Sequence, residues 1–113
     1  MKPIIYCGNS AKEICNFDTK AKRRVLRLLD MLRIGLELHP KDFKYMGTVG
    51  DGAYELQVRT VKQYRVFYVA KFDNAIYVLH AFIKKTQVTS RHDIEMGKQR
   101  YKAVVNYYRG TKK

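Results

Sequence analysis

The sequence has few of the residues that mark several common protein classes. Its 113 residues include no tryptophan, two prolines and two cysteines. Cys7 and Cys15 do not form a CxxC motif, and the three histidines lack the spacing of metal ligands. We therefore expect neither a metal site nor a bound cofactor. The N-terminal stretch does not resemble a signal peptide, so we expect a cytoplasmic protein without a structural disulfide.

Long apolar runs and acidic residues are also scarce. No run approaches the roughly 18 apolar residues of a membrane-spanning helix, and we expect no membrane association. Only 10 acidic residues oppose 23 lysines and arginines, which gives a formal net charge of +13. This excess is far larger than solubility requires, and phosphate polyanions are the commonest partners of such chains. The length and a 46% hydrophobic content suit one domain over residues 1–113.

Three helices are predicted along the chain. A capping box at residues 10–13 opens a short helix. A longer helix is predicted over 18–38, because apolar residues recur there at every third or fourth position. A second capping box, at residues 90–93, opens a final helix that ends near Tyr108. The polar face of the long helix carries six cations: Lys20, Lys22, Arg23, Arg24, Arg27 and Arg33.

Strands are predicted at residues 2–7, 53–60, 63–72 and 75–83, and residues 39–52 are expected to form a connection. The last strand is almost wholly apolar, as is typical of a strand covered on both faces. The order strand, helix, helix, three strands, helix predicts an α+β fold with a three-stranded antiparallel meander. Two helices should pack on one face of the sheet and leave the other partly open.

Cations on this sheet favour its open face as a binding surface. Alternation in residues 53–60 points Tyr54, Leu56 and Val58 inward and Glu55, Gln57 and Arg59 outward. Arg59 and Arg65 lie on adjacent strands, and Lys84 and Lys85 follow at the end of the last strand. If the strands pair in sequence order, these cations converge on one end of the sheet. Alternatively, Arg59 only pairs with Glu55 on the same face.

Four spaced motifs in this region resemble a known family. They are Tyr54-Glu55-Leu56-x-x-Arg59, Tyr64-Arg65-Val66-Phe67-Tyr68, Phe82-Ile83-Lys84-Lys85-Thr86-Gln87 and Thr89-Ser90-Arg91-x-x-Ile94-Glu95. Together they resemble the RelE/ParE toxin superfamily, and most closely its HigB-like, phage-derived branch.

The resemblance implies a RelE-like fold and the toxin of a type II toxin–antitoxin system. Such a toxin is a ribosome-dependent mRNA endonuclease that cleaves through the ribose 2′-hydroxyl without a metal. Its partners would be the ribosome, mRNA and a helix-turn-helix antitoxin, with which it could form a hetero-oligomer. Cations on the long helix and in the C-terminal stretch 84–113, Lys112 and Lys113 included, are either a solvated surface or a docking surface for these partners.

The expected chemistry assigns a role to each candidate residue. A guanidinium grips two phosphate oxygens at once, so Arg65 is the candidate for stabilising the transition state. Lys85 and His92 are candidates for proton transfer. Glu55 is either a general base or, as we favour, an orienting partner of Arg59. The RNA-binding candidates are Arg59, Lys84, Arg91 and Lys98.

Other residues leave alternatives open. His80 lies inside an apolar strand and is expected to be a core histidine, and Tyr64 and Tyr68 are expected to pack in the core. Where RelE-type relatives carry lysines on the second strand, this chain has Glu55 and Gln57, so their acid–base set is not reproduced. The alternative functions are a ParE-type gyrase-inhibiting toxin and a non-catalytic, decayed phage-derived nucleic-acid-binding module.

Overall fold

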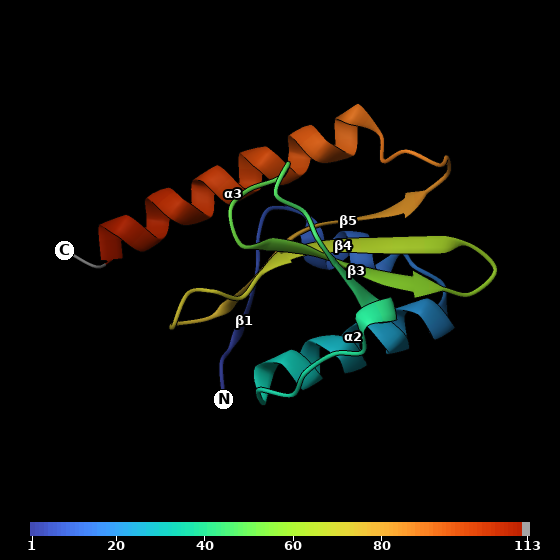
Figure 1. Ribbon diagram of the computed structural model, residues 1–113, viewed down its shortest axis with the longest axis horizontal. Helices are drawn as coiled ribbons and strands as arrows, with labels where there is room; N and C mark the ends of the chain where they lie inside the picture. Colours follow the sequence, from blue (N-terminus) through green and yellow to red (C-terminus); the bar gives the residue numbers. More distant parts are fainter. Residues whose placement is uncertain (112–113) are drawn as a thin grey trace.

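A five-stranded mixed sheet lies between helices on both sides (Figure 1). The computed structural model describes residues 1–111, so Lys112 and Lys113 lie outside the described residues. The elements in chain order are β1 (Ile4–Tyr6), α1 (Ser10–Cys15), α2 (Thr19–Arg33), the 3-10 helix η1 (Pro40–Asp42), β2 (Phe43–Tyr45), β3 (Ala53–Arg59), β4 (Gln63–Val69), β5 (Ile76–Lys84) and α3 (Arg91–Thr111). The α+β class is as predicted.

The sheet has the strand order β1-β5-β4-β3-β2. Strands β3, β4 and β5 pair antiparallel in sequence order, as predicted, while β1 pairs parallel with β5. The prediction that residues 39–52 are only a connection is wrong, because they contain η1 and β2. Strand β2 pairs antiparallel with β3, and the ring of Tyr54 lies between those of Phe43 and Tyr45. Three residues are too few to show a strand periodicity.

The long helix α2 ends at Arg33 rather than at Leu38. Gly35 adopts a φ of +83°, which glycine accepts without steric cost. The amide of Gly35 donates to the carbonyl of Leu32, and that of Leu36 donates to Met31. These two bonds form a Schellman motif, which closes the helix and leaves Leu36 half-exposed.

The two predicted capping boxes had different outcomes. At the start of α3 the Asp93 amide donates to Ser90 Oγ at 3.1 Å, which is one of the two bonds of the predicted capping box, and Ser90 Oγ itself donates to Asp93 Oδ2. At α1 the prediction is wrong, because Ser10 Oγ donates to the carbonyl of Val78 and the Glu13 carboxylate accepts from the amide of Ala81. The side chains of Ser10 and Glu13 therefore form hydrogen bonds with the backbone of β5 and not with that of α1.

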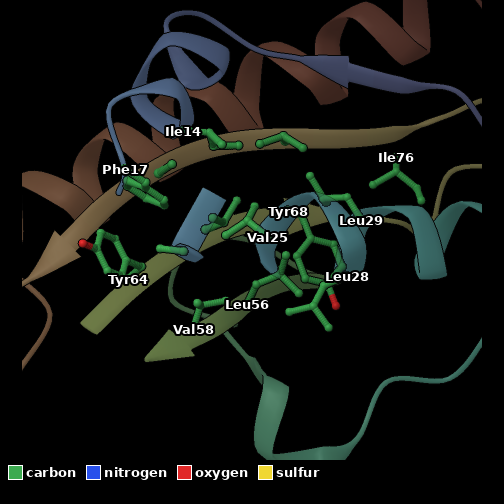
Figure 2. Packing of buried hydrophobic residues seen from close by; sticks show 14 of the residues in the cluster. Ile14, Phe17, Val25, Leu28, Leu29, Leu56, Val58, Tyr64, Tyr68 and Ile76 are labelled. Carbon is green, nitrogen blue, oxygen red and sulfur yellow. The ribbon is translucent and has the colours of Figure 1, made fainter. Parts of the chain in front are cut away.

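The apolar core has one part on each face of the sheet. Helices α1 and α2 cover one face, where Ile14, Val25, Leu28 and Leu29 pack against Leu56 and Val66 (Figure 2). Tyr64 and Tyr68 are buried in this part of the core, as predicted. The other face is less open than predicted, because α3 lies across it (Figure 1) and Phe67, Tyr77 and Val104 are buried there.

Gly97 lets α3 approach the sheet closely. A Cβ at this position would lie 2.7 Å from the ring of Phe67. No helix within residues 1–111 is long and apolar enough to cross a membrane.

Candidate functional site

The strand register brings the predicted cations to one end of one sheet face. Arg59 pairs with Gln63, and Gln63 pairs with Lys84, so these side chains form a row across β3, β4 and β5. Residues two positions apart in a strand share a face. Arg65 therefore lies in the next row on the same face, between Gln57 and Phe82. We call Arg59, Gln63 and Lys84 the sheet-end row.

The Arg65 guanidinium lies beneath the surface and is held on several sides. The residue is only 8% exposed. Its Nη2 donates to Gln63 Oε1 at 2.8 Å, its Nη1 donates to the carbonyl of Tyr64, and its Nε lies 3.3 Å from Glu55 Oε1. Burial lowers the pKa of Arg65, Glu55 opposes that shift, and the positive charge of Arg59 adds to it. Arg65 can meet a phosphate only after a partner such as Gln63 moves.

Glu55 does not point to solvent, and the prediction that it does is wrong. Alternation placed it on the correct face, but α3 packs on that face and the residue is 2% exposed. Its Oε1 accepts from Gln57 Nε2 at 3.0 Å and faces Arg65. Its Oε2 has no hydrogen-bond partner within residues 1–111. The favoured pairing with Arg59 is thus replaced by an ion pair with Arg65.

Lys84 and Lys85 lie beside a pocket of about 490 Å³. Lys84 is half-buried at the end of β5, and Lys85 follows it in an exposed position. Apolar parts of the pocket wall come from Phe17 and Ile83, with Val88 at the rim. The pocket therefore joins a cationic edge to an apolar wall next to the sheet-end row.

His80 is a buried residue, as predicted, but its charged partners were not foreseen. Its Nδ1 lies 3.1 Å from Glu13 Oε1, and its Nε2 lies 2.7 Å from Asp93 Oδ1. Arg100 Nη1 donates to the same Glu13 oxygen at 3.0 Å. A buried histidine ring inside an apolar strand needs hydrogen-bond partners for its two nitrogens, and this requirement was the signal in the sequence that polar partners must lie nearby. The cluster joins α1, β5 and α3.

Three other candidates lie on the surface of α3. Within residues 1–111, the wall of the Lys84 pocket includes Ser90 and Asp93 but not Arg91, His92 or Lys98. All three are exposed, and Lys98 Nζ lies 3.8 Å from Glu95. Arg91 and His92 thus lie in the chain between two residues of the pocket wall without lining it, and Lys98 lies further along α3. No three His, Cys, Asp or Glu side chains among the described residues are placed to hold a metal ion.

Comparison with known protein families identifies the family of this chain. No curated protein matches the sequence. The family model described as "Phage derived protein Gp49-like (DUF891)" matches residues 12–102, a span that runs from α1 into α3 and contains every candidate residue named above. The chain therefore belongs to the Gp49-like family of phage-derived proteins, a family of RelE/ParE-like toxins.

Proposed function

We propose that this protein is the toxin of a type II toxin–antitoxin system and cleaves mRNA on the ribosome without a metal. The observation that carries the proposal is the convergence of Arg59, Lys84 and Arg65 at one end of the sheet. The net charge of +13 and membership of a toxin-like family support a polyanionic target. Action on the ribosome would place the protein in the cytoplasm, where a helix-turn-helix antitoxin would cover this end of the sheet.

The cleavage forms one bond and breaks another at the same phosphorus. The 2′-oxygen attacks the adjacent phosphate, the bond to the 5′-oxygen breaks, and the products are a 2′,3′-cyclic phosphate and a 5′-hydroxyl. A base takes the proton of the 2′-hydroxyl, and an acid supplies one to the leaving oxygen. Cations aimed at the developing negative charge contribute most to such a reaction.

The sheet-end row supplies the first contacts with the substrate. Arg59 and Lys84 flank Gln63 and would hold successive phosphates. A phosphate oxygen that takes the place of Gln63 Oε1 would then accept a hydrogen bond from Arg65 Nη2. The buried Glu55 acts in this scheme as a positioning residue that holds Arg65.

Proton transfer is assigned to exposed groups. Lys85 lies next to Lys84 at the pocket edge, and His92 lies in the first turn of α3. Glu55 is too deeply buried to reach a 2′-hydroxyl. Lys85 and His92 are therefore the proposed base and acid, in an order that a pH–rate profile of the two single variants would assign.

Expression in cells that lack the antitoxin tests the proposal. Wild-type protein should stop growth and cut mRNAs that are being translated. Arg65→Lys keeps a positive charge beside Glu55 but loses the two-pronged donor, and it should abolish cleavage while the protein stays folded. Lys102→Gln, an exposed α3 variant outside the site, is the control and should remain toxic.

Two outcomes would contradict the proposal. Intact mRNA together with stalled DNA supercoiling would support a gyrase-directed toxin. Normal growth in the presence of folded protein would support a non-catalytic binding module.

A further inference from the structure

A second cationic depression lies beside the sheet-end row. Its volume is about 570 Å³, and it is enclosed by the start of α2, by η1 and by the end of β3. The lining residues are Lys20, Arg24, Lys41, Asp42, Gln57, Val58, Arg59 and Thr60. We call it the α2–β3 groove.

The fold builds this groove from contacts that fix both of its walls. Asp18 caps α2 by accepting from the amide of Ala21, and the same carboxylate accepts from Thr60 Oγ1 and from the Tyr64 hydroxyl. These bonds fix the start of α2 beside the end of β3. On the other wall, the pairing of Phe43 with Leu56 sets η1 alongside residues 57–59.

The charge of the groove is strongly unbalanced. Among its lining residues within 1–111, four are cations and one, Asp42, is an acid. Asp42 is 8% exposed and accepts from Arg24 Nη2 at 3.0 Å. In the ion pairs within residues 1–111, Arg24 is the one groove cation with an acidic partner. The groove thus presents three uncompensated positive charges to solvent.

We propose that the α2–β3 groove binds the phosphodiester backbone of RNA and extends the path that begins at the sheet-end row. Arg59 belongs to both surfaces, so a strand held at Arg59 and Lys84 can continue toward Lys20 and Lys41. The inference deepens the proposed function and rests on it, because the proposed function identifies the polyanion as RNA.

The lining chemistry favours RNA over a protein partner. Of the described residues that line the groove, Val58 alone is apolar, and it is just 3% exposed. Protein interfaces rely on aromatic and aliphatic anchors and are depleted in lysine. Phosphate backbones are held by lysine and arginine without apolar contact. The groove offers the second kind of surface.

The proposal separates the cations of α2 into two groups. Lys20 and Arg24 line the groove, whereas Arg23, on the same helix, does not. Lys44 on β2 is likewise exposed and outside the lining. Replacement of Lys20 and Lys41 can therefore be compared with replacement of Arg23 and Lys44, at equal loss of charge.

Binding of a short single-stranded 2′-O-methyl RNA tests the proposal, because this probe lacks the 2′-hydroxyl needed for cleavage. Fluorescence anisotropy would give the affinity at salt concentrations from about 50 to about 200 mM. The slope of log K against log salt is negative, and each lost phosphate contact reduces its magnitude by about 0.7 for single strands. Lys20→Gln/Lys41→Gln should therefore make the slope shallower by about 1.4, and Arg23→Gln/Lys44→Gln should change it far less.

Two results would overturn the proposal. Equal slopes for the two double variants would mean that the cations act as a diffuse coat. An unchanged RNA slope with lost inhibition by the antitoxin would make the groove a protein-docking surface. Lys20 and Lys41 are both exposed, so the fold should survive, which thermal unfolding would verify.

The binding test is independent of the cleavage test. A wild-type protein that fails to cut translated mRNA, but shows the expected slope difference, would refute the proposed function and leave the groove as an RNA site. A protein that cuts mRNA without the slope difference would refute the groove alone.

Discussion

Loss of the Arg65 guanidinium should weaken the fold as well as the proposed chemistry. The side chains of Arg65 and Glu55 are 10% and 2% exposed, and their charged atoms lie 3.3 Å apart. Removal of one partner from such a buried pair costs about 3–5 kcal/mol, because it leaves the other charge buried and unpaired. Since domains of this size have a free energy of unfolding of about 5–15 kcal/mol, Arg65→Met should lose a large fraction of its stability.

A double-mutant cycle would measure this coupling. Glu55→Gln in the Arg65→Met background removes the stranded carboxylate charge, so the double variant should regain much of the lost stability, with a coupling energy of about 0.5–3 kcal/mol. Urea unfolding followed by circular dichroism suits a chain without tryptophan. Arg59→Met, an exposed change on the same sheet face, is the control and should stay within about 0.5 kcal/mol of wild type. A loss below about 1 kcal/mol for Arg65→Met, or no coupling with Glu55→Gln, would refute the reasoning.

Two further predictions concern α3 and the start of α2. Gly97→Ala should lower the free energy of unfolding by about 1–3 kcal/mol, because its Cβ would press on Phe67. Gly110→Ala is the control, because a Cβ there meets open space, and it should raise the free energy of unfolding by about 0.5–1 kcal/mol. Thermal unfolding that finds Gly97→Ala more stable than Gly110→Ala would contradict the α3 packing. The hydrogen bonds that Asp18 accepts, above all the one from the Tyr64 hydroxyl, lower the pKa of Asp18 below 3.8. The stability that ionised Asp18 contributes to the fold is therefore present above pH 3.8 and is lost as the pH falls through the lowered pKa. Urea unfolding should therefore show a stability advantage over Asp18→Asn that shrinks below pH 3.8, and a constant advantage would contradict this.

Much of the sheet could be predicted from the sequence because its central strands are long and regular. Alternation within β3 assigned each side chain to its correct face, and the hairpin order of β3, β4 and β5 followed from the short turns. Alternation does not say which face a later helix will cover. Glu55 was therefore placed on the correct face but in the wrong environment.

The misses at α1 have a different physical cause. Ser10 and Glu13 have the spacing of a capping box, but α1 lies along β5, where Val78 is the last residue of the segment that pairs with β1 and Ala81 lies beyond it. The Ala81 amide at this sheet edge needs an acceptor, which Glu13 supplies, while Ser10 adds a second donor to the Val78 carbonyl beside the Cys7 amide. The hydrogen bonds to β5 thus replaced the local capping box, and a short window of sequence cannot show such long-range partners. The same reason hid the partners of His80, which lie 67 and 13 positions away.

The cluster around His80 also bears on how the chain folds. Arg100 and Glu13, which meet there, are separated by 87 positions, and β1 must wait for β5 before it can pair. Contacts between such distant segments slow folding, because the intervening loop must close first. Ribosomes add about 5–20 residues each second, so the first helix is exposed well before its partners on α3 are made. A newly made chain therefore passes through an interval with its N-terminal elements unpaired, during which a binding partner can reach surfaces that the finished fold conceals.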